Sequence, residues 1–155
     1  MKLLGDIMKQ YEQKYELKIK PNEYFIIRLD GCSFSKYTKK FNKPFDNNFS
    51  NAMISTMNDL VTKFSAQTGY THSDEISLVF DKINTLIDNN NHIYNGRIIK
   101  ICTIIASYCS LRFNYHIDNL IKKTDIKIEL NTACFDARIL TFDENNKYEL
   151  CNYFI

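Results

Sequence analysis

The sequence predicts an α+β domain on the ferredoxin-like, split β-α-β plan, with an antiparallel sheet and helices packed on one face. Its predicted elements follow the order strand, helix, strand, strand, helix, strand. The first strand opens with four apolar residues, Tyr24 to Ile27, which is typical of a strand buried on both faces. Both helices carry an apolar stripe. A right-handed crossover between the first two strands, which run parallel, would place the helices on the same face.

The composition indicates one intracellular domain. A chain of 155 residues can form one substantial core but not two. Its net charge of +2 permits nucleic-acid binding without requiring it. No apolar run approaches the roughly 18 residues that span a bilayer, and residues 1–20 contain no signal-peptide core. The five cysteines form no CxxC pair, so we expect reduced thiols, a cytoplasmic location and no structural zinc.

The N-terminal third predicts a helix, a strand and a basic loop. Residues 2–18 have apolar positions at helical spacing, and the strand at 23–30 follows Pro21. After Gly31, residues 36–43 form a basic stretch interleaved with Tyr37 and Phe41. This stretch favours a solvated loop, although the same side chains also suit phosphates and bases.

The middle of the chain predicts a helix followed by a hairpin. Asp46 or Asn47 can cap the helix. The stripe within the helix indicates core packing and not a cofactor site. Its members are Phe49, Met53, Met57, Leu60 and Phe64. The run from Gly69 to Phe80 predicts a tight hairpin with Asp74 near its turn.

The C-terminal half predicts a loop, a helix and further strands. Residues 81–95 are rich in Asn and Asp and suggest a loop, with room for one helical turn around Leu86. A helix is predicted over 96–113. Arg97 and Lys100 lie near its start, where cations oppose the helix dipole, which hints at a ligand although solvent would tolerate both.

The remaining residues predict the end of the sheet. Residues 118–127 are polar, 126–130 are strand-like, and 134–140 suit the final strand. Repeats, heptads and flexible linkers are all missing from the sequence. We therefore expect a single domain over residues 1–155.

The strand order predicts that two carboxylates meet. Asp30 ends the first strand, and Asp74 follows the second strand at the same edge, beside Glu75. Converging carboxylates raise each other's pKa, pair with a cation or hold a divalent metal. Gly31 would let main-chain groups approach a metal or phosphate. Two Mg²⁺ ions held about 3.5–4 Å apart would support nucleotidyl transfer. The alternative is that Asp30 is a turn residue and Asp74 lies at a solvated hairpin tip.

Several segments resemble one enzyme family. The chain resembles the tRNA-His guanylyltransferase family, including the tRNA 5′-end repair enzymes that polymerise in the 3′–5′ direction. The resemblance covers most of the chain, and the paired acidic motifs at this separation are its most specific part. It rests on Gly5 to Glu12, Arg28-Leu29-Asp30-Gly31 with Phe34, Phe41 to Asp46, Ser73 to Phe80, Arg97 with Lys100, and Phe135-Asp136-Ala137-Arg138.

The resemblance implies a polymerase-like palm with a two-metal site. Asp30, the Gly31 carbonyl and Asp74 would bind two Mg²⁺ ions, and Asp30, Asp74 and Glu75 would be catalytic. ATP would activate a tRNA 5′ end, which the 3′-hydroxyl of GTP or another nucleotide would then attack. A tetramer of identical chains is implied. The implied nucleotide-binding residues are Asp30, Gly31, Cys32, Ser33, Phe34, Ser35, Lys43, Ser73 and Asp74, and the implied phosphate or tRNA contacts are Arg28, Arg97 and Lys100.

The chain also departs from the family pattern. Cys32 stands where a basic residue is usual, Ser35 where a His is common, and Thr71-His72 replaces Gly-Gln. His72 is expected to be a hairpin residue without a chemical role. Family members continue beyond residue 155 into a tRNA-facing segment, so we expect a catalytic palm without its C-terminal part. Guanylation and repair remain open, as do a non-catalytic RNA- or nucleotide-binding palm and a palm-type nucleotide cyclase.

Overall fold

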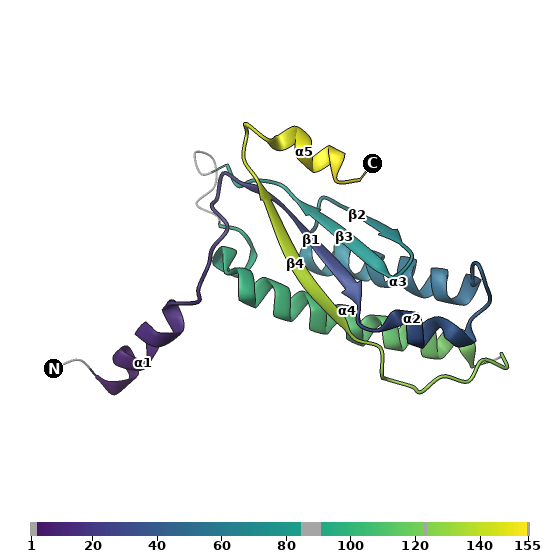
Figure 1. The fold of residues 1–155 in the computed structure, drawn as a ribbon. Helices are drawn as coiled ribbons and strands as arrows, with labels where there is room; N and C mark the ends of the chain where they lie inside the picture. The colour runs from purple at the N-terminus through teal and green to yellow at the C-terminus, as the bar shows by residue number, and fades with distance from the viewer. Residues whose placement is uncertain (1–2, 85–90, 123, 155) are drawn as a thin grey trace.

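A computed structural model describes residues 3–84, 91–122 and 124–154. Its centre is a four-stranded sheet in the order β2-β3-β1-β4 (Figure 1). The strands are β1 (Tyr24–Gly31), β2 (Thr68–His72), β3 (Glu75–Phe80) and β4 (Phe135–Phe142). All neighbouring strands pair antiparallel, so β1 and β2 run parallel with β3 between them. The predicted fold class is therefore confirmed.

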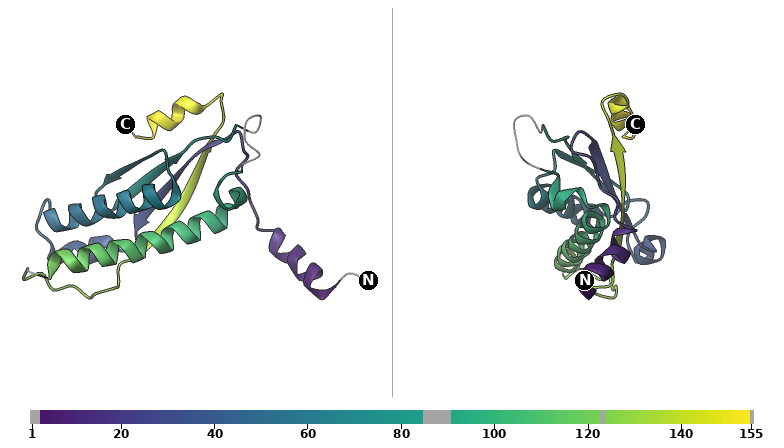
Figure 2. Two further views of the ribbon diagram at one scale, coloured as in Figure 1. Left: turned by 180° about the vertical axis from the view of Figure 1, so that it is seen from behind. Right: turned by 90° about the vertical axis from the view of Figure 1, so that its left-hand side faces the viewer.

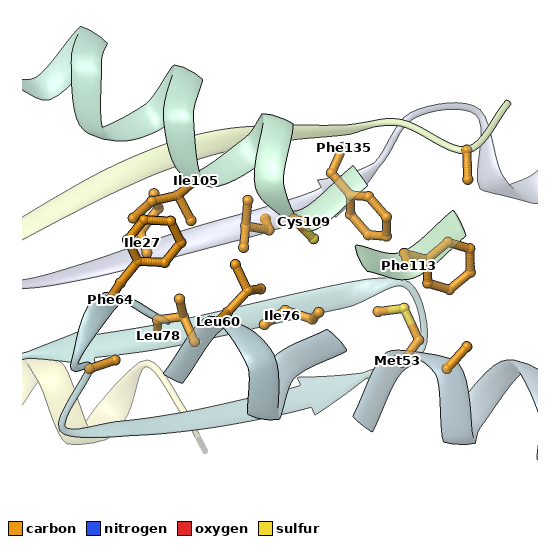
Figure 3. Close-up of a cluster of buried hydrophobic side chains, with 14 of the residues drawn as sticks. Ile27, Met53, Leu60, Phe64, Ile76, Leu78, Ile105, Cys109, Phe113 and Phe135 are labelled. Atoms are coloured by element: carbon orange, nitrogen blue, oxygen red, sulfur yellow. The ribbon is translucent and has the colours of Figure 1, made fainter. Parts of the chain in front are cut away.

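Two long helices cover one face of the sheet. They are α3 (Asn47–Phe64) and α4 (Ile98–Ile121), which lie side by side under the strands (Figures 1 and 2). The main core lies between these helices and the sheet (Figure 3). Of the predicted α3 stripe, Met53, Leu60 and Phe64 are buried, and Phe49 and Met57 pack against the core.

Side-chain hydrogen bonds help to set where the helices begin and how far they extend. The Asp46 carboxylate caps α3, since its Oδ1 accepts from the Asn48 and Phe49 amides at 2.8 and 3.1 Å. In α4, the buried Asn114 amide group bonds the Ser110 and Ala133 carbonyls, both at 2.7 Å. Asn114 thus ties the helix to the segment that leads into β4.

The opposite face of the sheet is open at one end and covered at the other. Side chains alternate along a strand, so Ile26 faces away from the main core that Phe25 and Ile27 enter. Ile26 forms a second, small cluster with Val79 and Phe142. The helix α5 (Lys147–Asn152) and the residues after it cover this cluster, which adds a helix on the face where none was expected.

The N-terminal helix is shorter than predicted and extends away from the sheet (Figures 1 and 2). It is α1 (Leu4–Gln13) in place of residues 2–18, and none of its residues is buried. The following segment joins the body where the Ile98 amide donates to the Leu17 carbonyl at 3.0 Å. Among the described residues, no helix combines the length and apolarity that crossing a bilayer requires.

Three further element predictions need correction. Residues 36–43 contain parts of α2 (Phe34–Tyr37) and a 3₁₀ turn, η1 (Thr38–Lys40), because the buried Phe34 anchors them on the core. The α4 helix continues to Ile121 and not to residue 113. Residues 126–130 form no strand, although Ile126 and Ile128 pack against the core. A second 3₁₀ turn, η2 (Ile93–Gly96), precedes α4, and the turn predicted around Leu86 lies outside the described residues.

Candidate active site

The candidate site lies where β1 ends, on the open face of the sheet. Asp30 is paired directly with Glu75 of β3 and with Asp136 of β4. Side-chain alternation places Asp30 on the same face as Ile26 and Arg28, away from the main core. Three carboxylate residues therefore occupy one row across the sheet.

The hairpin turn places the Asp74 backbone beside the end of this row. The Gly31 amide donates to the Asp74 carbonyl at 3.1 Å, which joins the end of β1 to the turn between β2 and β3. Ser73 has a left-handed backbone with φ of 54°, and its hydroxyl donates to Asp74 Oδ1 at 3.1 Å. The backbones of the two segments are therefore adjacent, and the meeting of the Asp30 and Asp74 carboxylates stays a prediction.

Two guanidinium groups partly neutralise the carboxylates. Arg28 Nη2 lies 2.7 Å from Glu75 Oε1 and 3.8 Å from Asp30 Oδ2. Arg138 Nη2 lies 3.9 Å from the same Asp30 oxygen, and its Nε lies 3.7 Å from Asp136 Oδ1. A hydrogen bond with Tyr153, helped by the charges of Glu75 and Asp30, raises the pKa of Arg28. Four carboxylates against two guanidiniums leave this end of the sheet formally negative, which favours a bound cation.

The segment after β1 turns sharply around an aromatic ring. A Cβ atom on Gly31 would lie 2.4 Å from the Phe34 ring, so glycine is required here by packing. Ser33 follows with a left-handed φ of 57°. The Cys32 amide is engaged, because it donates to the Cys134 carbonyl at 2.9 Å. Phe34 and Ser35 begin α2, where amide groups have no acceptor within the helix.

A pocket beside the hairpin turn contains the predicted lysine. It has a volume of ≈ 280 Å³ and is lined by Lys43, the start of α3 and the turn residues His72 and Ser73. Asp46 connects these parts, since its Oδ2 accepts from the Asn42 amide at 3.1 Å while its other oxygen caps α3. Lys43 and Ser73 thus share one concave surface next to Asp74.

Arg97 and Lys100 do not join this group. Both lie at the beginning of α4, at the opposite end of the sheet from the tip of β1 (Figure 1). Arg97 forms an ion pair with Glu16, and the Lys100 ammonium lies 5.5 Å from the Tyr94 ring centroid. These partners offset the unfavourable position of two cations at a helix N-terminus. In this chain, they form a separate surface with α1.

The structure adds three residues that received no role from the sequence. Asp136 and Arg138 belong to the site through the pairing of β4 with β1. Alternation within residues 135–138 places both on one face, but only the strand register shows that this face is the one carrying Asp30. Tyr153 lines a pocket of ≈ 370 Å³ with Arg28 and Glu75. The ring of the next residue, Phe154, is centred 5.8 Å from the ring of Tyr70.

The carboxylates at this end of the sheet suit Mg²⁺ better than a metal that is coordinated by protein side chains alone. Among residues 3–84, 91–122 and 124–154, no three His, Cys, Asp or Glu side chains converge into a metal-binding cluster. Mg²⁺ typically takes one or two carboxylates and completes its octahedron with water and phosphate oxygens. Asp30 and Asp74 offer two carboxylates on segments that the Gly31 amide joins, which is the number that Mg²⁺ requires.

Comparison with known proteins identifies the family. The family model described as tRNAHis guanylyltransferase matches residues 5–143. An uncharacterized protein of Acanthamoeba polyphaga mimivirus is 48% identical over 166 residues, covering 98% of this chain and 56% of its own. The tRNA(His) guanylyltransferase of Schizosaccharomyces pombe is 31% identical over 140 residues, covering 88% of this chain and 49% of its own. The chain thus spans about half the length of these relatives.

Solved structures agree with the sequence comparison. A bacterial tRNA(His) guanylyltransferase-like protein in complex with GTP matches with a TM-score of 0.82 and 30% identity, covering 97% of this chain and 67% of its own. The structure with ATP matches with a TM-score of 0.83 and 29% identity, covering 98% of this chain and 63% of its own. Because the family model covers most of the sequence, the chain belongs to the tRNAHis guanylyltransferase family.

Proposed function

We propose that this chain is a nucleotidyltransferase that adds GTP, or another nucleoside triphosphate, to the 5′ end of a tRNA in the 3′–5′ direction. The observation that carries this proposal is the hydrogen bond from the Gly31 amide to the Asp74 carbonyl, which joins the segments of Asp30 and Asp74 beside the pocket of Lys43 and Ser73. We infer that this edge of the sheet binds the metal and that Lys43 in the pocket contacts phosphates. The GTP- and ATP-bound structures of the bacterial relative support both nucleotides as substrates.

Each part of the site has a proposed role. Asp30, Asp74 and the Gly31 carbonyl would hold two Mg²⁺ ions, with Glu75 as a supporting carboxylate. When bound, these ions would polarise phosphate oxygens and lower the pKa of an attacking hydroxyl. Arg28 orients Glu75 through their 2.7 Å ion pair and supplies positive charge near Asp30.

The triphosphate would lie along the segment after β1. The Gly31 amide is occupied by Asp74 and the Cys32 amide by Cys134, so the amides of Ser33, Phe34 and Ser35 are the ones we propose for phosphate contacts. Cys32 would then border the nucleotide without donating its amide. The Lys43 ammonium and the Ser73 hydroxyl would contact phosphates from the pocket on the other side.

Larger partners are part of the same proposal. We propose that Arg97 and Lys100 contact tRNA or phosphate away from the Asp30 end, because they lie at the start of α4. A homo-oligomer, a tetramer by family resemblance, is supported by the exposed apolar residues of α1, including Leu4, Met8 and Tyr11. The single catalytic palm over residues 1–155 and the cytoplasmic location stay predictions of this proposal.

The test is a nucleotide-transfer assay on two RNAs. The chain is incubated with Mg²⁺, ATP and labelled GTP, together with either a tRNA-His without its extra 5′ guanosine or a tRNA shortened at its 5′ end. Asp74→Ala is compared with Asp81→Ala, which removes an exposed carboxylate beyond the other end of β3. We expect 5′ label with the wild type and Asp81→Ala, and none with Asp74→Ala.

The RNA that is labelled separates guanylation from repair. Full activity in Asp74→Ala would contradict the proposed site. Magnesium-dependent nucleotide binding without transfer to either RNA would favour a binding palm, and a cyclic product formed without RNA would favour a cyclase.

A further inference from the structure

Two cysteines face each other at the edge of the proposed triphosphate segment. The β1–β4 register pairs Gly31 with Phe135, and one further step places Cys32 opposite Cys134. The Cys32 amide donates to the Cys134 carbonyl at 2.9 Å, so the two backbones remain paired at this step. Directly opposed residues in antiparallel strands have Cα atoms about 4.5–5.5 Å apart. This falls within the range of about 4.4–6.8 Å that a disulfide spans.

The two side chains share one face and are accessible. Cys32 Sγ lies 3.9 Å from Asp136 Oδ2, on the open face that also carries Asp30. Because opposed residues of paired strands project to the same side, the Cys134 side chain lies on this face as well. Both cysteines are exposed free thiols, whereas Cys109 is buried within α4. A small reagent in solution can therefore reach this pair.

We propose that Cys32 and Cys134 are a redox modification site and form a reversible disulfide with each other. The oxidant is a low-molecular-weight disulfide such as oxidised glutathione. One protein thiolate attacks the small disulfide, which forms a mixed disulfide and releases one small thiol. The second protein thiolate then attacks the protein sulfur of the mixed disulfide and releases the second small thiol. The protein loses two electrons, the small disulfide gains them, and the protein's two protons pass through solvent to the released thiolates. An exposed disulfide of this kind is readily reduced again.

The disulfide would act on nucleotide binding, and this consequence rests on the proposed function. Cys32 lies between Asp30 and the amides of Ser33, Phe34 and Ser35 that we propose for the triphosphate. A bond to Cys134 would anchor that segment to the start of β4 and replace the thiol beside Asp136. The segment could then no longer adjust around the phosphates, so we expect oxidised protein to bind GTP more weakly.

The chemical test does not depend on activity. The full chain is treated with oxidised glutathione, blocked with an alkylating reagent, digested and analysed by mass spectrometry with and without reduction. We expect a reducible peptide pair that joins Cys32 to Cys134 in the wild type and in Cys151→Ser, and its loss in Cys134→Ser. Cys151 is a matched control because it is an exposed free thiol in α5. Only glutathione adducts, or no linked pair, would overturn the proposal while leaving the proposed function intact.

The functional test compares GTP affinity before and after oxidation. We expect oxidation to weaken binding on the order of tenfold in the wild type and in Cys151→Ser, with recovery after dithiothreitol. Cys134→Ser protein in which mass spectrometry finds Cys32 free of glutathione should bind GTP equally well under both conditions, and circular dichroism should show that it is folded. Unchanged GTP affinity in protein with a verified Cys32–Cys134 bond would overturn the effect on binding. Weak GTP binding by the reduced wild type would instead count against the proposed function.

Discussion

Asp30 is the residue on which the proposed chemistry depends most. Its Oδ2 lies 3.8 Å from Arg28 and 3.9 Å from Arg138, so its charge is balanced loosely by two cations in this structure. Partly exposed ion pairs of this length contribute little stability, typically about 0–1 kcal/mol. A divalent cation and its phosphate ligands can therefore displace these contacts at small cost to the fold.

Lys43 should affect nucleotide affinity more than metal binding. Lys43 lines the pocket together with Ser73, the residue that precedes Asp74. Its ammonium group has only donors and cannot coordinate a cation. We expect Lys43→Ala to raise KM for the triphosphate roughly tenfold, since a charge-assisted phosphate contact contributes about 1.5 kcal/mol or more. Steady-state kinetics at saturating Mg²⁺ measure this change. Lys63→Ala, on the far part of α3, is the control, and equal KM values for all three proteins would remove Lys43 from the site.

Gly31 should prove essential for stability. An added Cβ would lie 2.4–2.6 Å from three atoms of the Phe34 ring, which itself packs against Phe113 and Phe135. We expect Gly31→Ala to lower the free energy of unfolding by about 1–3 kcal/mol, the usual cost of overpacking a core. Urea denaturation measures the difference. Gly5→Ala has open space around the added carbon, so it should leave the unfolding free energy nearly unchanged. Equal stabilities for both variants would contradict the packing argument.

At the residue scale, the sequence predicted the parts of the site that sit at strand ends and turns. Asp30 and Asp74 follow from strand order, because that order alone decides which ends share an edge. Asp136 could not be found in this way, since its place opposite Asp30 depends on the register of β4. A single sequence does not show which residues of two polar strand ends lie opposite each other.

At the scale of elements, α3 and α4 are held together on their outer side by one acidic residue. Asp59 Oδ2 lies 2.6 Å from Arg112 Nε and 2.6 Å from His116 Nε2. Burial by itself raises the pKa of Asp59, but the hydrogen bonds from His116 and Arg112 outweigh it and lower the pKa overall. The carboxylate therefore stabilises the folded state above its unfolded pKa of about 3.9, and this contribution is lost as the pH falls through the lower folded pKa.

The substitution Asp59→Asn should reveal this pH dependence. We expect it to reduce the unfolding free energy by about 1 kcal/mol at pH 5, a modest value because the cluster is partly exposed. The difference from wild type should shrink as the pH falls below about 4. Urea titrations over this pH range measure it, with the exposed Asp125→Asn as control. A difference that is the same at pH 5 and pH 3 would contradict the role of the ionised carboxylate.

The predicted elements differ from the structure where long-range contacts determine the end of a helix or the formation of a strand. The sequence predicted a helix over 96–113, but the next residue, Asn114, is buried and bonded to Ala133. The apolar stripe of α4 then continues through Ile117 and Ile121. Residues 126–130 alternate like a strand, yet they pack on the core without a partner strand. Their alternation could not reveal that β2 and β4 already form the edges of the sheet.

At the scale of the whole molecule, two pairs of cationic side chains lie at opposite ends of one sheet. Arg28 and Arg138 lie beside Asp30, whereas Arg97 and Lys100 lie at the start of α4 near α1 (Figure 1). A tRNA bound to one copy would have to extend along the sheet to reach both regions. A second copy that brings its own α4 to the Asp30 end would remove this separation.

The central claim is that Asp30 and Asp74 hold the metal and triphosphate together at the end of β1. Calorimetric titration with GTP, in Mg²⁺ and again after Mg²⁺ is chelated, tests it most directly. We expect the wild type and Asp81→Asn to bind GTP far more tightly with Mg²⁺ than without it, and Asp30→Asn and Asp74→Asn to lose this dependence while remaining folded. Variants at both positions that bind GTP with the metal dependence of the wild type would contradict the account.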